Sequence, residues 1–538
     1  MATSTIKRIV IDGYRKFDHL DIEPTARMNI LVGDNESGKS TLTEAIYLAL
    51  SGKINGRSAS EELNPFWFHR PRVLEYFEKH GSPQAIAAPQ IFIELHLGDG
   101  DDNVHQLRGV HNSLKLDCPG VRLLIEPNED FEQEFAAYMM DRPPRVLPVE
   151  FYRVEWRDFS DRVLTARPKE LAVSFIDSRT IRSTSGVDYH TREMLSGHLD
   201  PKERAVISLA HRRAKQDITD NHLAGINDRI AQGSRSLHDR PLGLQMDQSA
   251  RTSWEVGIVP QVDDIPFGMA GQGQQAAVKV SLAMSRTSGR SRYVLIEEPE
   301  NHLSHTSLTK LVDRIEQFTS DGDQQTFITT HSSFVLNRLG LDKLLLIHDG
   351  QTAKLTALDP RTVAYFRKLS GYDTLRLVLA QKVALVEGPS DDIVLQRAVR
   401  DATGKDPIDL GIDIISMQGL AFRRALEVCA ALDRSAIAIR DNDGKDRANL
   451  RAKLQKLLAD GRRELLMGDP ACGKTLEPQL IAVNDEATLR RVLGLPDDTE
   501  LNKWMTNGKT EAALRILDSD ESIVMPDYIN QAVKLLVS

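Results

Sequence analysis

Cysteines and long apolar runs are both scarce in this chain of 538 residues. The three cysteines, Cys118, Cys429 and Cys472, lie far apart and form no CxxC pair, which argues against a disulfide scaffold and a cysteine-ligated zinc site. No stretch approaches the roughly 18 uninterrupted apolar residues of a membrane-spanning helix. Residues Met1 to Lys7 lack the apolar segment of a signal peptide. We therefore expect a protein of the reducing cytoplasm with no membrane partner.

Basic residues are not in excess either. Lysine and arginine number 68 against 77 acidic residues, for a net charge of -9. A nucleic-acid-binding protein of this charge would need a local basic surface, and its acidic excess can include metal ligands. The apolar fraction of 41% and charged fraction of 27% are ordinary for folded protein and exclude disorder across the whole chain. At about 150 residues a domain, the length predicts three or four domains.

The order of expected elements divides the chain. Strand-like runs dominate the first 175 residues and predict a mixed sheet, whereas residues 189–240 are rich in charged residues, Ala and Leu and predict helices that meet a partner. After Arg361, strands and helices alternate, which indicates a parallel α/β sheet. The strands expected there are 383–386, 412–416 and 436–439, and the helices between them are 391–401 and 421–431. The last 60 residues or so are expected to be mostly helical.

A phosphate-binding loop is predicted at residues 33–40, GDNESGKS, which fit GxxxxGK[ST] between an expected strand and an expected helix. Backbone N–H groups of such a loop surround phosphates, and the helix N-terminus favours anions. Lys39 would reach the β- and γ-phosphates, and the Ser40 hydroxyl would hold Mg²⁺. The candidate nucleotide-binding residues are Gly33, Asn35, Gly38, Lys39, Ser40 and Thr41.

A second part of the nucleotide site is predicted where the apolar strand 293–296 ends in two acids. We assign Glu297 to the metal and Glu298 to the attacking water, against the alternative of an ordinary strand followed by a charged turn. His331 follows the next strand and is the candidate γ-phosphate sensor. The 258 positions between Lys39 and Glu297 exceed the needs of a compact domain, so we expect an ATPase in two lobes with a helical insertion.

These segments carry a family resemblance. The sequences IDGYRKF, GDNESGKST, VLIEEPENHLS and ITTHSSF resemble the ABC-type ATPase head of the SMC/RecF group, and more narrowly the OLD (overcoming lysogenization defect) family, which includes the Gabija nuclease subunit. In such heads a signature loop from one protomer completes the nucleotide site of its partner. The matching segment is 268–274, GMAGQGQ, which departs from the pattern because Ala270 or Gln272 replaces the usual serine.

A carboxylate cluster is predicted in the last third of the chain. Glu387 and the pair Asp441 and Asp443 follow expected parallel strands, whose carboxyl ends meet at one edge of a sheet. Close carboxylates repel each other unless a divalent cation lies among them, and oxygen ligands suit Mg²⁺ or Mn²⁺. The EGPSD and DND sequences resemble a Toprim domain, and that pattern adds Asp391 as a ligand. No tyrosine nucleophile is evident, which favours hydrolysis over topoisomerase-type transesterification.

Two further candidates depend on the resemblance. Residues 468–475, GDPACGKT, also fit GxxxxGK[ST], but Pro478 falls in the first turns of the helix that should follow. The better match is the TLE-like element of OLD Toprim domains, which makes Glu477 a ligand of a second metal. Lys509 matches a lysine motif of OLD nucleases and would neutralise phosphate charge, unless it is simply a solvated lysine at a helix start.

The resemblance implies an α/β protein in four parts. Residues 1–180 would form a first ATPase lobe, 181–250 a helical dimerisation insertion, 251–360 a second ATPase lobe, and 361–538 a Toprim nuclease domain with a C-terminal helical part. The implied activity is an ATP-binding, metal-dependent DNA endonuclease in anti-phage defence, acting as a homodimer or larger homo-oligomer and compatible with a helicase partner. The alternatives are a DNA-repair or chromosome-associated ATPase that uses Toprim as a platform, and a primase- or topoisomerase-like enzyme.

Overall fold

The structure is a computed structural model that divides into two compact units. The first unit comprises residues 1–29 and 38–330, and the second comprises residues 30–37 and 331–538. The described residues are 5–54, 56–80, 83–100, 102–141, 146–177, 199–233, 242–249, 254–259, 261–262, 264–284, 292–321, 324–348, 350–355, 358–369, 373–417, 422–444 and 446–538. The domain boundaries that we predicted near residues 180 and 250 lie outside the described residues.

An antiparallel sheet forms one layer of the first unit, with strand order β2-β1-β6-β8-β7 and β9 paired to β8. Its strands are β1 (Ile6–Tyr14), β2 (Phe17–Ile22), β6 (Ile91–Leu97), β7 (Arg108–Gly109), β8 (Cys118–Pro127) and β9 (Tyr152–Asp158). Residues 5–177 thus do not form the single mixed sheet that we predicted. All the pairings within this layer are antiparallel, and the parallel strands of the unit form a separate ladder.

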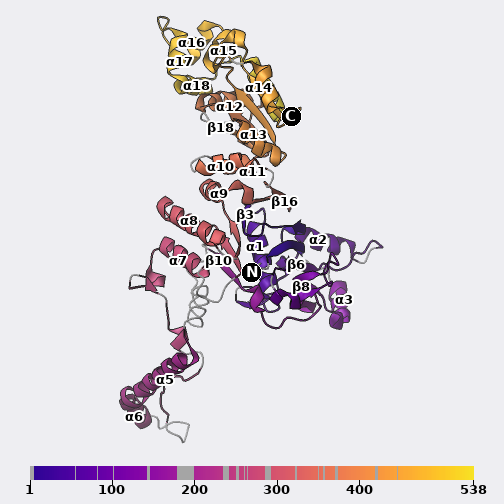
Figure 1. The fold of residues 1–538 in the computed structure, drawn as a ribbon, viewed down its shortest axis with the longest axis vertical. Helices are drawn as coiled ribbons and strands as arrows, with labels where there is room; N and C mark the ends of the chain where they lie inside the picture. Colours follow the sequence, from indigo (N-terminus) through magenta and orange to yellow (C-terminus); the bar gives the residue numbers. More distant parts are fainter. Residues whose placement is uncertain are drawn as a thin grey trace. The chain divides into compact units, whose positions relative to one another are not determined.

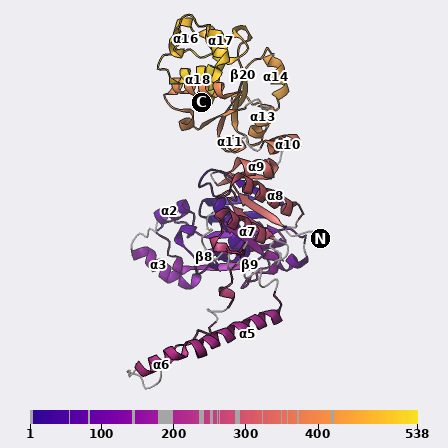
Figure 2. The same cartoon turned by 90° about the vertical axis from the view of Figure 1, so that its left-hand side faces the viewer.

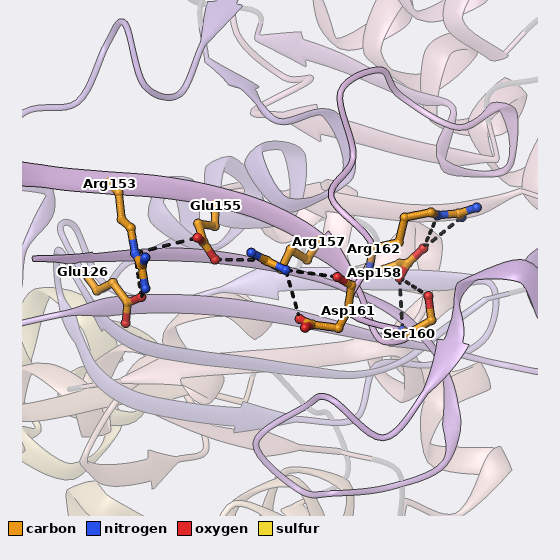
Figure 3. A network of polar contacts seen from close by, with 8 residues as sticks. All are labelled: Glu126, Arg153, Glu155, Arg157, Asp158, Ser160, Asp161 and Arg162. Atoms are coloured by element: carbon orange, nitrogen blue, oxygen red, sulfur yellow. Dashed lines mark hydrogen bonds and ion pairs between the residues drawn. The ribbon is translucent and has the colours of Figure 1, made fainter. Parts of the chain in front are cut away.

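The side chains of the edge strand β9 alternate between the two faces of this layer. Arg153, Glu155 and Arg157 project from one face and form a chain of ion pairs with Glu126 and Asp161 (Figure 3). On the opposite face, the Trp156 indole N–H donates to the Ala49 carbonyl at 2.8 Å. Charged side chains on this edge strand disfavour pairing with a strand of another chain. Trp156 fixes the sheet against the helix that contains Ala49.

That helix is α1 (Lys39–Ser51), which contacts the antiparallel sheet and also a parallel ladder. The ladder in the first unit consists of β10 (Val173–Asp177), β13 (Tyr293–Glu297) and β14 (Gln325–Thr329). All five residues of β13 are buried, as expected for a strand covered on both faces. Helix α1 therefore lies against the strand that carries the second half of the predicted nucleotide site.

Helices complete the first unit. They are α2 (Arg70–Lys79), α3 (Glu132–Asp141), α5 (Pro201–Asp217), α6 (Ala224–Gly233), α7 (Gln272–Met284) and α8 (His305–Asp321). Helices α5 and α6 lie end to end and are joined by a π-helical turn, Ile218–His222 (Figure 2). A capping box at Asp200 starts α5, whose Val206, Ile207 and Leu209 side chains are exposed. Helices are thus present in the described part of this region, as expected.

The second unit includes the strand that precedes the phosphate loop. Residues of β3 (Met28–Val32) pair in parallel with β15 (Leu344–His348), which pairs antiparallel with β16 (Gln351–Lys354). Helix α9 (Ser333–Leu339) precedes β15 in the chain. Helices α10 (Pro360–Lys368) and α11 (Thr374–Leu379) follow β16.

A four-stranded parallel sheet with order β18-β17-β19-β20 forms the rest of the second unit (Figure 1). Its strands are β17 (Lys382–Val386), β18 (Ile412–Ser416), β19 (Ser435–Arg440) and β20 (Arg463–Met467). Its helices are α12 (Pro389–Thr403), α13 (Phe422–Ala431), α14 (Arg447–Leu454), α15 (Leu476–Val483), α16 (Glu486–Leu493), α17 (Leu501–Asn507), α18 (Lys509–Asp518) and α19 (Asp527–Val537). The predicted alternation is present, although Ala421, the first residue of one expected helix, lies outside the described residues. None of the helices in the described ranges has the length and hydropathy to cross a membrane.

Candidate nucleotide-binding and metal-binding sites

The phosphate loop depends on two glycines. A Cβ on Gly33 would lie 2.3 Å from the Ile347 carbonyl oxygen and 2.4 Å from Ser37 Oγ. Gly38 has a φ of +109°, and a Cβ there would lie 2.8 Å from the Phe17 ring. Neither position tolerates a side chain, so the residues present fit a backbone cradle for phosphate.

Helix α1 begins directly after this loop, at Lys39. Lys39 and Thr41 are buried and Ser40 is half-buried in its first turn, whereas Asn35 is exposed in the loop. The helix N-terminus therefore carries the lysine and hydroxyl groups at the positive end of the helix dipole, which favours an anion.

Glu297 and Glu298 end β13 in different environments. Glu297 is buried, and its Oε1 accepts a hydrogen bond of 2.5 Å from Thr43 Oγ1 of α1. Glu298 is half-buried with a φ of +46°, an unusual conformation for a non-glycine residue, and Asn301 Nδ2 donates to its Oε2 at 2.8 Å. The two acids thus point to different partners, which agrees with separate roles for them.

His331 belongs to the second unit, is exposed, and follows β14 by two residues. Strand β14 pairs in parallel with β13, with Thr329 opposite Glu297. The predicted order of strands is therefore present, and the sensor role of His331 stays a prediction.

A cavity of about 790 Å³ lies beside the start of α1. Thr41 of α1, Arg15 and Lys16 of the β1–β2 turn, and the aromatic residues Phe66 and Trp67 contribute to its lining. Phe66 is 68% exposed. Our sequence analysis missed this cavity because its lining comes from four separate segments.

In the second unit, the parallel sheet brings the predicted carboxylates together. Strands β17 and β19 are neighbours, and Glu387 and Asp441 follow their last residues. Asp391 lies in the first turn of α12, where its Oδ2 accepts a hydrogen bond of 3.0 Å from the Gly388 N–H. Asp443, with a φ of +49°, is exposed in the turn after β19.

The electrostatics of these acids reflect their proximity. Burial raises the pKa of Asp441 to about 7, and repulsion from Asp391, Glu387 and Glu477 adds to that rise. Burial likewise raises the pKa of Asp391 to about 6, with further contributions from Glu387 and Glu477. The four carboxylates therefore repel one another, as expected for a site that a cation would stabilise.

Glu477 lies in the first turn of α15 and is only 3% exposed. Its Oε2 accepts a hydrogen bond of 2.7 Å from Thr475 Oγ1 and lies 3.3 Å from Lys509 Nζ. Lys509 is thus more than a solvated lysine at a helix start, since it pairs with a member of the carboxylate cluster.

The arrangement fits a divalent cation in its chemistry. Among the described residues, no donor reaches the buried Asp441 Oδ1, and such an orphaned acceptor in an acidic cluster suits a metal ion. Yet no three His, Cys, Asp or Glu side chains in the described ranges are placed to hold an ion together. The ligand types are therefore present, and their side chains would have to turn toward one another to share an ion.

Two residues near the cluster were missed by our sequence analysis. Arg440, the last residue of β19, donates from Nε to Glu387 Oε1 at 2.9 Å. Tyr528 of α19 is buried; that burial, together with the nearby carboxylates, raises the pKa of its hydroxyl well above the usual value. An arginine at a strand end is an ordinary surface feature, and Tyr528 is far from the motifs in sequence, so neither gave a readable signal.

The second GxxxxGK[ST] match does not form a phosphate cradle like the first. Gln479 Nε2 donates to the Gly473 and Asp469 carbonyls, and Asn442 Nδ2 also donates to Gly473 at 2.6 Å. These side chains fill the loop from within. Helix α15 starts at Leu476, with Pro478 in its first turn. Thr475 at the end of this loop donates to Glu477, and the role of Glu477 as a metal ligand stays a prediction.

Family models match three parts of the chain. Residues 8–118 match an AAA domain, and residues 157–337 match an AAA domain described as a putative AbiEii toxin of a type IV toxin–antitoxin system. Residues 378–443 match the Toprim domain of overcoming lysogenization defect protein-like proteins. The first two matches cover the nucleotide-site residues through Glu298 and His331, and the third covers Glu387 through Asp443.

Individual relatives are more distant. The chain is 22% identical over 375 residues to the DNA replication and repair protein RecF of Lachnospira eligens, covering 64% of this chain and 98% of the relative. The RecF protein of Streptococcus suis is 23% identical over 376 residues, covering 64% and 97%.

Solved structures are similar at low sequence identity. The C-terminal region of the Burkholderia pseudomallei OLD protein is 18% identical with a TM-score of 0.25, covering 29% of this chain and 97% of that one. The Smc head domain of Pyrococcus furiosus is 13% identical with a TM-score of 0.33, covering 65% and 95%. From the family models, the chain contains AAA-type ATPase segments followed by an OLD-like Toprim domain, as the resemblance in its sequence predicted.

Proposed function

We propose that this protein is an ATP-binding, divalent-metal-dependent DNA endonuclease. The observation that carries the proposal is the Toprim carboxylate cluster, in which Asp441 has a buried oxygen without a donor among the described residues and a pKa raised to about 7. A cluster degraded to a structural role would be expected to lose some of its acids, whereas Glu387, Asp391, Asp441, Asp443 and Glu477 are all present.

In this proposal, Glu387, Asp391, Asp441, Asp443 and Glu477 would hold Mg²⁺ or Mn²⁺. The bound metal would supply neutralisation of the phosphodiester charge and a more acidic water. Lys509, which now pairs with Glu477, would neutralise charge on the phosphate at the transition state. Asp441 is half-buried and Glu477 is buried, so bulk water weakens the electrostatic interactions of these carboxylates less than it would at the surface.

The ATPase head would bind ATP through Gly33, Asn35, Gly38, Lys39, Ser40 and Thr41. Glu297 would hold the nucleotide's Mg²⁺, and Glu298 would orient the attacking water with His331 as γ-phosphate sensor. The cavity beside Thr41 would receive the base and ribose, because its aromatic and basic lining suits a planar base and a nearby phosphate charge.

DNA as substrate is supported by the RecF relatives, which are DNA replication and repair proteins and align along 64% of this chain. The same likeness favours one alternative, a DNA-associated repair ATPase in which Toprim is a platform. The exposed apolar residues on α5 are consistent with a homodimer or larger assembly. A role in anti-phage defence and a helicase partner come from the OLD resemblance alone.

Cleavage of supercoiled plasmid tests the nuclease proposal. We expect wild-type protein to nick or cut plasmid with Mg²⁺ or Mn²⁺ and to be inactive in EDTA. Asp441→Ala should reduce the rate at least about 100-fold, because it removes a proposed ligand. An inactive wild type with intact ATPase activity would favour the platform alternative.

The nucleotide site has its own test, which is independent of the nuclease. Glu298→Gln keeps the size and the hydrogen bond to Asn301 but removes the charge, so ATP should still bind while hydrolysis falls by about 100-fold or more. Fluorescent-nucleotide binding and phosphate release separate these two steps. Unchanged hydrolysis would exclude Glu298 as the residue that acts on water.

A further inference from the structure

Arg440 contacts two acids of the proposed metal site. Its Nε donates to Glu387 Oε1 at 2.9 Å, and its Nη2 lies 3.9 Å from Asp443 Oδ2. Its guanidinium also lies over the Phe422 ring, 5.1 Å from the centroid. The side chain is therefore held by three contacts, and two of those contacts are acids that a divalent cation would need.

Lys509 makes a similar contact on another member of the cluster, Glu477, at 3.3 Å. A further member, Asp441, has an Oδ1 that no donor reaches within the described part of the chain. Two side-chain cations thus pair with three acids of the cluster, Glu387, Asp443 and Glu477. In the same arrangement, no three acids in the described ranges are placed to hold an ion together.

We propose that Arg440 is a positioning residue that exchanges Glu387 for a phosphate of the substrate when a divalent cation binds. The inference rests on the proposed nuclease function. A carboxylate oxygen that ligates a divalent cation is a poor acceptor for a guanidinium at the same time, because the two positive groups repel each other. An ion that binds through Glu387 Oε1, the oxygen that Arg440 contacts, would therefore release Arg440 at the same edge of the sheet.

The chemistry of Arg440 identifies what it binds next. A guanidinium pairs with carboxylates and with phosphates in the same two-pronged geometry, so a phosphodiester oxygen pair can replace Glu387 without a change of partner type. The guanidinium lies 5.1 Å from the Phe422 ring centroid, a cation–π contact that does not depend on Glu387 and can persist through the exchange. The exchange would couple metal binding to substrate positioning within one residue.

Direct measurement of Mn²⁺ binding to metal-stripped full-length protein tests the exchange. Arg440→Gln removes the competing charge, so calorimetry should give a Mn²⁺ dissociation constant about three- to tenfold lower than that of wild type. Arg440→Lys keeps the charge and should bind Mn²⁺ within about twofold of wild type. A matched control is Arg400→Gln, which breaks an exposed pair with Asp406 elsewhere in the same sheet domain and should change nothing.

Tighter metal binding is a result that loss of a merely structural arginine would not produce. At saturating Mn²⁺, plasmid cleavage by Arg440→Gln should fall about tenfold or more, and Arg440→Lys should fall by less, since its point charge replaces only part of the two-pronged contact. Equal or weaker Mn²⁺ binding by Arg440→Gln would overturn the exchange while leaving the metal site intact. Absence of Mn²⁺ binding in both proteins would instead refute the metal site of the proposed function, and the exchange with it.

Discussion

At the scale of single residues, Asp441 dominates the account because its raised pKa has a measurable consequence. Its pKa in the folded protein is about 7, above the ordinary 3.8, so the folded state takes up a proton more readily than the unfolded state. The stabilising contribution of that proton is complete below pH 3.8 and is lost as pH rises through 7. Without metal, the ionised Asp441 therefore destabilises the fold at pH 8.

The corresponding prediction concerns Asp441→Asn in EDTA. The variant should melt about 2–4 °C higher than wild type at pH 8, and the difference should shrink toward pH 5 as Asp441 becomes protonated in the wild type. Differential scanning calorimetry at the two pH values measures this. Asp460→Asn is the matched control, because the Asp460 side chain is 98% exposed. A melting difference independent of pH would contradict the assigned pKa.

Protons should also compete with metal at this residue. Because Asp441 must be ionised to ligate a cation, Mn²⁺ affinity should rise between pH 6 and pH 8 and then level off. Calorimetric titration across this range checks the prediction. Affinity that is flat with pH would show that Asp441 does not bind the ion.

The positions of acids at strand ends could be predicted from the sequence, whereas their roles stay predictions. Glu387 and Asp441 were readable because each follows an apolar strand, and parallel strands bring their carboxyl ends to one edge. The contact of Arg440 could not be predicted from the sequence, because its partner, Glu387, is separated from it by 53 positions. Tyr528 reaches the cluster from the last helix, a proximity that only tertiary packing creates.

At the scale of elements, one buried arginine ties the Toprim helices together. Arg397 of α12 is 5% exposed and donates to the carbonyls of Ile516, Ser519 and Glu521, in the last turn of α18 and the segment that follows it, while it pairs with Asp401 at 2.7 Å. The Ile516 carbonyl is among the groups that a helix end leaves without an internal partner, and the other two carbonyls belong to the segment that follows the helix. Arg397 therefore acts as the cap of α18.

Arg397→Met should destabilise the second unit by about 2–4 kcal/mol, because it leaves buried carbonyls without donors while keeping the apolar stem. Urea unfolding followed by circular dichroism measures the loss. Arg400→Gln, three residues along the same helix and exposed, is the control and should change stability by less than about 0.5 kcal/mol. Equal stability of the Met variant would mean that water replaces the arginine.

Most elements and the parallel sheet after Arg361 were predictable, but the strand pairing in the first part of the chain was not. The strands before Gly33 and Glu387 and the helices that follow them showed clear apolar runs bounded by glycine or proline. The first 175 residues nevertheless suggested one mixed sheet, since local alternation does not say which strands pair. Pairing depends on contacts between distant segments, such as β10 with β13, which are separated by more than a hundred residues.

At the scale of the whole molecule, the chain joins two chemistries, and their coupling is open to a direct test. Lys39→Ala should abolish ATP binding while leaving the Toprim residues untouched. If nucleotide state controls cleavage, ATP should change the plasmid-cutting rate of wild type and leave the rate of the variant unchanged. Rates measured with and without ATP for both proteins give the answer. Identical behaviour of wild type with and without ATP would remove the coupling.

The central claim is that the Toprim carboxylates cut DNA, and one comparison tests it most directly. Supercoiled plasmid would be incubated with Mn²⁺ and wild-type, Asp441→Asn or Asp460→Asn protein, with ATP hydrolysis measured in the same samples. The account predicts cleavage by wild type and Asp460→Asn, at least about 100-fold less by Asp441→Asn, and equal ATPase rates in all three. Equal cleavage by all three proteins would contradict it.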